Sequence, residues 1–242
     1  LGGTQWSKGD LAHDFADTRW AVWNDDFRES AKTFLMGRGD FQNRDLLMHS
    51  ITGNHIRYGG WTLRPQQRIN YLTSHDGATL ADYVRHDKKR AFLGMLILMT
   101  SQGVPMLAAG DEMGRTQNGN NNAYCQDNEI SWLNWELDSH ERKFLSFVST
   151  VINLRRAHPV FHRRHFFQGR RIKGANVKDI CWLRPDGQEM TDEEWSSYYA
   201  RCLGLLLHGD AIEEQDERGR IIHDDTFLLL LNAHSQAIPF RM

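Results

Sequence analysis

A histidine and an aspartate, His75 and Asp76, directly follow the alternating apolar segment 69–72 and precede Gly77. The alternation predicts a strand, and the glycine predicts a turn at its end. In a barrel of parallel strands, the side chains that do chemistry converge at the carboxyl ends of the strands. The pair is therefore a candidate site, although an isolated histidine more often merely satisfies a backbone carbonyl than binds a substrate.

Two adjacent acidic residues, Asp111 and Glu112, follow the apolar segment 104–109. Hydrolysis of a glycosidic bond requires two carboxyl groups that flank the bond, one as acid and one as nucleophile or base. Asp76 with Glu112 is one possible pair. Aspartate and glutamate also commonly cap loops, so a structural role for Asp111 and Glu112 is the alternative.

Histidines next to acidic residues raise the possibility of a metal site. The dipeptides His75-Asp76 and His86-Asp87 combine imidazole with carboxylate, a ligand set that suits several divalent ions and would fit a metal-dependent phosphohydrolase. The second dipeptide lies in the strongly cationic segment 85–90, whose charges oppose a metal ion. A phosphohydrolase is therefore an alternative to glycoside hydrolysis and not our first interpretation.

Three further histidines, His158, His162 and His165, have helix-like spacing within the basic segment 155–173. This segment could contact phosphates, but the chain as a whole is not basic. We interpret the cluster as a solvated basic surface and not as a zinc site. Among the aromatic residues, Trp61, Trp132 and Trp135 could offer flat faces to sugar rings, although most tryptophans are ordinary core or rim residues.

Composition restricts the class of protein. With 242 residues, of which 40% are hydrophobic, the chain can bury one large core or two smaller ones. Its formal net charge of -2 provides no field that would recruit nucleic acid or an anionic membrane. Cys125, Cys181 and Cys202 are far apart and outside any CxxC pattern, which favours reduced thiols, and hence a cytoplasmic protein, over a disulfide framework.

Alternating helices and strands must position the candidate residues. Asp25 or Asp26 can cap a helix with an apolar face that includes Phe27 and Leu35. The uncharged segment 91–110 is long enough to cross a membrane, but polar residues interrupt it. It predicts a buried helix that ends near Ser101 with Gly103 as its cap, followed by a short buried strand over 104–109.

The remaining elements follow from similar patterns. A long polar loop over 114–128 is of a length that is often functional. A further helix begins at Asp138 or Ser139 and ends before Pro159. Residues 1–20 are rich in glycine, aspartate and other polar residues and predict a loop, whereas the residues between the first helix and Pro65 form a mixed segment. Strand and helix alternate, which is typical of an α/β barrel or doubly wound sheet. Beyond residue 165, three short apolar runs predict a small antiparallel β domain, at 180–183, 202–207 and 227–231.

Several segments together resemble the glycogen-debranching and isoamylase branch of the α-amylase superfamily. The most specific is the run Gly-Asn-Asn-Asn-Ala-Tyr-Cys-Gln-Asp-Asn-Glu-Ile-Ser-Trp at 119–132. The other segments that carry the resemblance are 23–25, 72–77, 101–106, 110–117, 182–187 and 224–232.

The resemblance implies an α/β fold, in which residues 1–165 form the C-terminal part of a (β/α)8 TIM barrel and 166–242 form a partial antiparallel β-sandwich. It implies a retaining hydrolase, without a cofactor, that cleaves α-1,6 branch linkages in glycogen or a limit dextrin. His75 and Asp76 together would hold adjacent hydroxyls of the reacting sugar, and Asp76 would also stabilise the transition state. Asn120 and Asn122 would help to form the rim that recognises the branched glucan.

Two departures from the family pattern affect what this chain can do. The family's nucleophilic Asp and acid Glu lie on its fourth and fifth strands, and this sequence begins just after the fifth, so we expect the 242 residues alone to be inactive. The family's long insertion is also replaced here by the short segment 85–90, which removes part of the substrate rim. A non-catalytic glycan-binding remnant is therefore an alternative, together with the less favoured metal phosphohydrolase.

Overall fold

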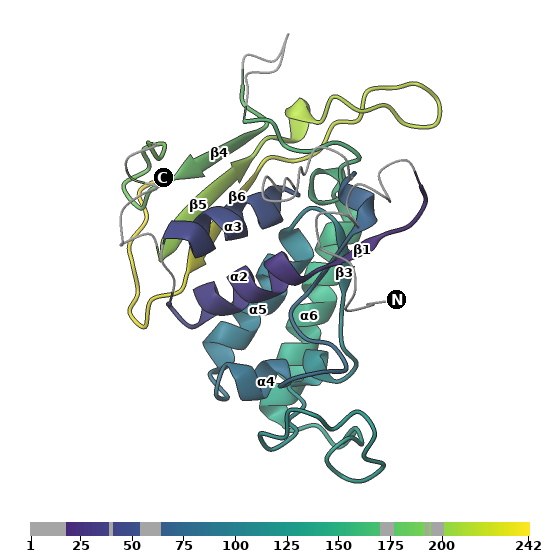
Figure 1. The fold of residues 1–242 in the computed structure, drawn as a ribbon. Coiled ribbons are helices and arrows are strands. Elements are labelled where there is room, and N and C mark those ends of the chain that lie inside the picture. Colours follow the sequence, from purple (N-terminus) through teal and green to yellow (C-terminus); the bar gives the residue numbers. More distant parts are fainter. Residues whose placement is uncertain (1–17, 39–40, 54–63, 170–176, 192–193, 195–200) are drawn as a thin grey trace.

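The computed structural model describes residues 18–38, 41–53, 64–169, 177–191, 194 and 201–242 (Figure 1). The first half contains parallel strands alternating with helices, and the last part contains antiparallel strands. The helices and strands, in chain order, are β1 (Val22–Asn24), α2 (Asp25–Leu35), α3 (Phe41–Thr52), β2 (Arg68–Tyr71), α4 (Leu80–Tyr83), α5 (Lys88–Thr100), β3 (Val104–Met106), α6 (Ser139–Ala157), β4 (Ile180–Leu183), β5 (Cys202–Leu207) and β6 (Phe227–Asn232).

The candidate site depends on a parallel sheet with the strand order β1-β2-β3. Trp23 of β1 pairs with Ile69 of β2, and Tyr71 pairs with Met106 of β3. Helices lie between successive strands in the sequence, which brings all three carboxyl ends to the same edge. The predicted α/β arrangement is thus confirmed, and β2 falls within one residue of its predicted position.

The prediction for β3 was partly wrong. The strand ends at Met106 and not at residue 109, and Val104 is 42% exposed where we expected a buried strand. Pro105 lacks the N–H that a ladder needs, which favours a short strand at an edge of the described sheet. The chain then turns at Gly110, whose φ is +95°.

The helix boundaries also differ in detail from those expected. Asn24, and not Asp25 or Asp26, caps α2, because its Oδ1 accepts a hydrogen bond from the Phe27 N–H at 3.1 Å. The same amide donates to Asn70 of β2 at 2.9 Å, so the cap also joins two strands. Ser101, and not Gly103, is the C-cap of α5.

Gly103 has a different role from the capping role predicted for it. Its φ is +114°, and a Cβ at this position would lie 2.9 Å from the Arg68 carbonyl oxygen and 2.9 Å from Asn70 Nδ2. Glycine therefore permits both the left-handed backbone and the close approach of the α5–β3 connection to β2.

The C-terminal strands form an antiparallel sheet, as predicted, and their order in the sheet is β4-β5-β6. Leu205 at its centre lies opposite Trp182 and Leu229. One hydrophobic core includes residues of this sheet and of the helices, from Phe27 to Leu231. Figure 1 shows the antiparallel sheet and the polar loop after β3 at opposite ends of the helical layer. Within the described residues, no helix has the length and apolar character needed to span a membrane.

The basic segment 155–173 begins in the last turn of α6, and its residues Arg156, His162, Arg164 and His165 are exposed, as predicted for a solvated surface. Two of its arginines, Arg155 and Arg163, are buried and depart from this prediction. Arg155 is 8% exposed and donates to the carbonyl oxygens of Met99 at 2.8 Å, Ser101 at 2.7 Å and Gly103. Burial lowers its pKa to about 10. A guanidinium provides several donors in a planar fork, so it can satisfy several carbonyl oxygens of one tight connection at once.

A second arginine of this segment is also buried. Arg163 is 4% exposed, and its Nη1 lies 3.1 Å from Oδ2 of Asp179, which is fully buried. Asp179 also accepts hydrogen bonds from the backbone N–H groups of Gln168 and Gly169, each at 2.8 Å. The ion pair therefore joins the segment after α6 to the residue that precedes β4.

Candidate functional site

His75 and Asp76 lie just beyond the carboxyl end of β2, where the sequence predicted them. Both residues are exposed, and the Asp76 side chain has 56% of its surface accessible. Buried residues precede them, including Tyr71 at 1% and Leu72 at 2% exposure. A packed strand thus delivers two polar side chains to the surface, as expected for a functional strand end.

An arginine on the neighbouring helix holds the Asp76 carboxylate. Nη1 of Arg28, on α2, lies 3.1 Å from Oδ1 and 3.4 Å from Oδ2 of Asp76, and the Ser74 hydroxyl donates to the same carboxylate. The Ser74 hydrogen bond and the positive charge of Arg28 lower the pKa of Asp76 despite partial desolvation. The site therefore presents an ionised carboxylate at neutral pH.

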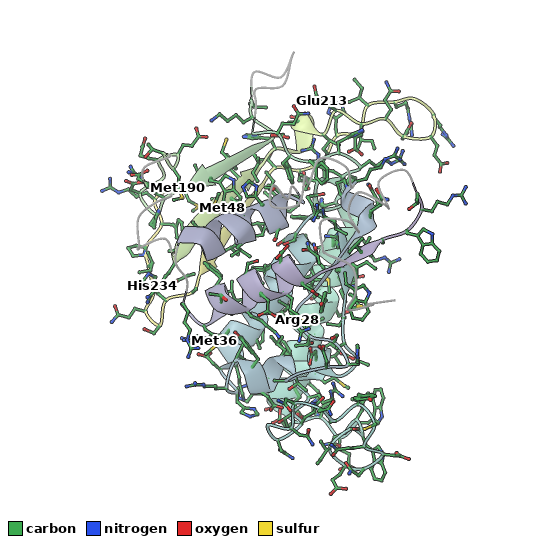
Figure 2. All side chains as sticks on the ribbon, in the orientation of Figure 1. Arg28, Met36, Met48, Met190, Glu213 and His234 are labelled. Carbon is green, nitrogen blue, oxygen red and sulfur yellow. The ribbon has the colours of Figure 1, made fainter. Side chains whose placement is uncertain are left out.

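Arg28 is itself held in place by Tyr71. Its side chain is only 15% exposed, and its guanidinium lies 5.5 Å from the centre of the Tyr71 ring. The Tyr71 hydroxyl donates to Asp25 in the first turn of α2. Burial lowers the pKa of Arg28, but the interactions with Tyr71 and Asp76 outweigh it, and the net shift is upward. Figure 2 shows Arg28 on α2, the helix that directly follows β1.

Two aromatic rings flank the His75 imidazole. The ring of Trp23, from β1, lies 6.1 Å from it at an interplanar angle of 64°. The ring of Tyr124, from the long polar loop, lies 6.2 Å away at 82°. Sequence reasoning missed Arg28, Trp23 and Tyr124 as site residues. Trp23 and Tyr124 lie in segments 23–25 and 119–132, which carry the family resemblance, whereas Arg28 had only its helical spacing from Asp25 as a local signal.

The long polar loop is attached to the strand end. The Gly77 N–H donates to the Asn121 carbonyl oxygen at 2.9 Å, and Gln117 Nε2 donates to the Asn120 carbonyl oxygen at 2.6 Å. Asn120 is half-buried. Its Nδ2 donates a hydrogen bond to Gln126 Oε1 at 3.2 Å, and its Oδ1 accepts one from the Asn122 N–H at 3.0 Å. Asn122 is exposed. The Asn120 amide thus shapes the loop, and the exposed Asn122 side chain lies on its outer surface.

Asp82 of α4 anchors the start of this loop. Its carboxylate accepts hydrogen bonds from the Thr116 hydroxyl, from the Gln117 N–H at 2.8 Å and from the Gly119 N–H at 3.4 Å. The side chain is 6% exposed. Desolvation opposes ionisation, but the accepted hydrogen bonds outweigh it and lower the pKa of Asp82.

Asp111 and Glu112 make contacts that stabilise the fold. Asp111 is 2% exposed and accepts hydrogen bonds from the Thr73 hydroxyl and from the Leu80 N–H at 3.2 Å, which connects β2 to α4. Burial raises the pKa of Asp111. Glu112 accepts from the Gly110 N–H at 2.8 Å and so closes its own turn. Both carboxylates thus accept hydrogen bonds that hold the local fold. This arrangement does not support Asp76 and Glu112 as a catalytic pair.

Two of the three histidines that have helix-like spacing, His158 and His165, have different partners. His158 Nδ1 lies 2.7 Å from Asp224 Oδ1, whereas His165 Nδ1 lies 3.3 Å from Glu214 Oε1. His158, Asp224 and Asp225 lie close enough to share an ion, but Oδ2 of Asp224 accepts from the Val160 N–H at 2.9 Å. The Asp224 contacts connect the end of α6 with the start of β6.

The metal-phosphohydrolase interpretation of His75-Asp76 meets a similar difficulty. The positive charge next to Asp76 comes from the Arg28 guanidinium, and among the described residues His75 and Asp76 do not belong to a group of three side chains close enough to hold an ion. His86 lies 3.6 Å from Asp82, and Asp87 caps α5 by accepting from the Arg90 N–H at 3.3 Å. The two His-Asp dipeptides therefore have separate structural surroundings.

Comparison with known proteins identifies the family. No protein-family model matches the sequence. The glycogen operon protein GlgX homolog of Mycobacterium tuberculosis is 37% identical over 266 residues, which cover 92% of this chain and 36% of the relative. The glycogen debranching enzyme of Dickeya chrysanthemi is 31% identical over 263 residues, with the same coverage of 92% and 36%. The chain belongs to the glycogen-debranching enzyme family.

Solved structures agree with this assignment to the debranching enzymes. A pullulanase from Paenibacillus barengoltzii, solved without ligand, matches this chain with a TM-score of 0.63 and 26% sequence identity. The matched region covers 88% of this chain and 31% of the pullulanase chain. The same enzyme in complex with maltohexaose and α-cyclodextrin has a TM-score of 0.65 and 24% identity, covering 93% and 33%. The chain thus spans about a third of the length of the debranching relatives it matches, 36% for the curated proteins.

Proposed function

We propose that this chain carries the sugar-holding part of a retaining glycoside hydrolase that cleaves α-1,6-glucosidic branch linkages in glycogen or a limit dextrin. His75 and Asp76 hydrogen-bond adjacent hydroxyls of the reacting glucose, and Asp76 also stabilises the positive charge that develops on this sugar in the transition state. The observation that carries the proposal is the ionised Asp76 carboxylate, held by Arg28 beside an exposed imidazole at a strand end.

The rest of the chain fits the same function. Residues 1–165 supply part of the barrel, and 166–242 supply part of the β-sandwich. Asn120 and Asn122 lie on a loop that is hydrogen-bonded to the strand end, where they would meet the branched chain. The partner is a branched α-glucan and not nucleic acid or a membrane. We place the protein in the cytoplasm, where its three free thiols would stay reduced.

The 242 residues should bind this glucan without hydrolysing it. A retaining mechanism needs a nucleophile and an acid about 5 Å apart across the scissile bond, and Asp76 alone supplies neither role. Release of linear maltooligosaccharide from a limit dextrin by the purified chain would refute this part of the proposal.

Affinity electrophoresis through gels that contain glycogen limit dextrin tests the binding. We expect the chain to be retarded and Asp76→Asn to lose most of the retardation, because the amide keeps the shape of the side chain but loses the charged acceptor for the sugar hydroxyls. Asp210→Asn is the matched control, since Asp210 is an exposed carboxylate that also pairs with a basic side chain, His223, at 3.1 Å. Equal retardation of Asp76→Asn and the parent chain would overturn the assignment of Asp76.

A further inference from the structure

The surroundings of His75 contain an aromatic surface that the proposed roles of His75 and Asp76 do not use. Trp23 is 44% exposed and Tyr124 is 68% exposed, although both are large aromatic side chains. They come from distant parts of the sequence and contact His75 through separate edge-on arrangements. Exposed aromatic residues gathered beside polar groups often mark a binding site.

The positions of both rings are fixed by other contacts. Trp23 pairs through its backbone with Ile69, and its ring lies 5.3 Å from that of the buried Tyr71. Tyr124 lies on the loop that Asp82 anchors at Gln117 and that Gly77 bonds at Asn121. A rigid aromatic side chain binds at a small entropic cost when its backbone is already held.

We propose that Trp23 and Tyr124 form an aromatic wall around His75 that packs against the apolar face of an α-linked glucose ring. This inference rests on the proposed function and names the part of the site that fixes the position of the sugar. A pyranose ring has hydroxyls around its edge and C–H groups on its faces. The imidazole and the carboxylate of this site can bind the hydroxyls at the edge of the sugar, and the aromatic rings can pack against its C–H face.

The wall places Tyr124 on the loop side of the sugar and Trp23 on the strand side. The polar groups then orient the ring through its hydroxyls, whereas the aromatic rings select a flat pyranose over other polyols. Tyr124 is a positioning and specificity residue in this arrangement and takes no part in bond cleavage. Its hydroxyl group is dispensable, but its ring is not.

Saturation-transfer NMR with maltotriose as the probe tests the wall on the full 242-residue chain. We expect Tyr124→Ala to weaken binding about tenfold, the loss that corresponds to one aromatic contact, and Tyr124→Phe to bind like the parent chain. Trp23→Phe should bind more tightly than Trp23→Ala. Trp20→Ala is the matched control, because Trp20 is a 64% exposed tryptophan that precedes the amino end of β1.

The outcomes separate this inference from the proposed function. If maltotriose does not bind the parent chain, or if His75→Ala binds as well as the parent, the proposed function fails and the wall with it. If His75→Ala weakens binding but Tyr124→Ala does not, only the wall is refuted. Thermal unfolding of each variant is measured in parallel. Should Tyr124→Ala unfold, Tyr124→Leu provides the same comparison with the apolar volume kept and the ring removed.

Discussion

Replacement of Asp82 by alanine should release the loop that carries Asn120, Asn122 and Tyr124 while leaving most of the fold intact. The Asp82 carboxylate is 6% exposed and accepts hydrogen bonds from Thr116 and from the Gln117 N–H at 2.8 Å. The third bond, from the Gly119 N–H, is longer at 3.4 Å. The side chain thus fixes the beginning of the loop at Thr116 and Gln117, with a weaker contact at Gly119.

The size of the effect follows from these contacts. A hydrogen bond to a charged group contributes about 1.5–3 kcal/mol, so the loss of the two shorter bonds should destabilise the closed loop by about 3 kcal/mol. The Gly119 bond is too long to add much. Because each 1.4 kcal/mol corresponds to a factor of ten, the open form of the loop should become roughly a hundredfold more populated.

Amide hydrogen exchange measures this population directly. We expect the Gln117 and Gly119 amides to lose roughly two orders of magnitude of protection in Asp82→Ala, while amides in the middle of α5 change little. Asp87→Ala is the matched control, because Asp87 lies five residues along the chain and also accepts a backbone N–H, but its partner is Arg90 in α5. The control variant should lose about 1 kcal/mol of helix stability with the cap of α5, and the loop amides should keep their protection from hydrogen exchange.

Unchanged protection of the Gln117 amide in Asp82→Ala would refute the anchoring role. Equal loss throughout α5 and the loop would also count against it, since the variant would then have destabilised the whole fold. Binding of maltotriose gives a second readout, because a detached loop no longer holds Tyr124 beside His75. The variant should therefore bind more weakly even though Asp82 itself does not touch the sugar.

Two other predictions follow from charged groups. The lowered pKa of Asp82 means that the stabilisation of the loop by its carboxylate is complete above the unfolded-state pKa near 3.8 and is lost as the pH falls through the still lower folded-state pKa. Exchange protection at the Gln117 amide should therefore stay constant from pH 7 to about 4 and fall below about 4. Asp82→Asn should remove this pH dependence. Arg155→Met should lower the free energy of unfolding in urea by about 3 kcal/mol, because three carbonyl oxygens lose their donor, whereas Arg156→Met at the exposed neighbouring position should change it little.

The elements that were predictable from the sequence are those with a strong repeating pattern. The apolar residues of α6 recur at helical spacing behind a capping box at Asp138, and β4 to β6 are compact apolar runs between turns. β1 has only three residues, too few for an alternation to be recognised, and α3 was missed because its apolar residues do not gather on one face. Trp61 lies outside the described residues.

The buried arginines could not be predicted for a different reason. Arg155 and Arg163 lie among other charged residues, a pattern that usually indicates a solvated surface. What buries them is a tertiary requirement: three carbonyl oxygens at the end of α5 in one case, and the fully buried Asp179 in the other. Neither partner set lies within a helical turn of the arginine, so no local pattern could reveal it.

The same distinction explains what was found and what was missed at the site. His75 and Asp76 were recognisable because a strand, a polar pair and a glycine follow one another directly in the sequence. Their supports come from afar: Arg28 is 48 residues away from Asp76, and the Tyr124 loop is joined through Gly77. All of these supports belong to the present chain. We therefore expect the sugar-holding half of the site to assemble in these 242 residues, with glucan binding separable from hydrolysis.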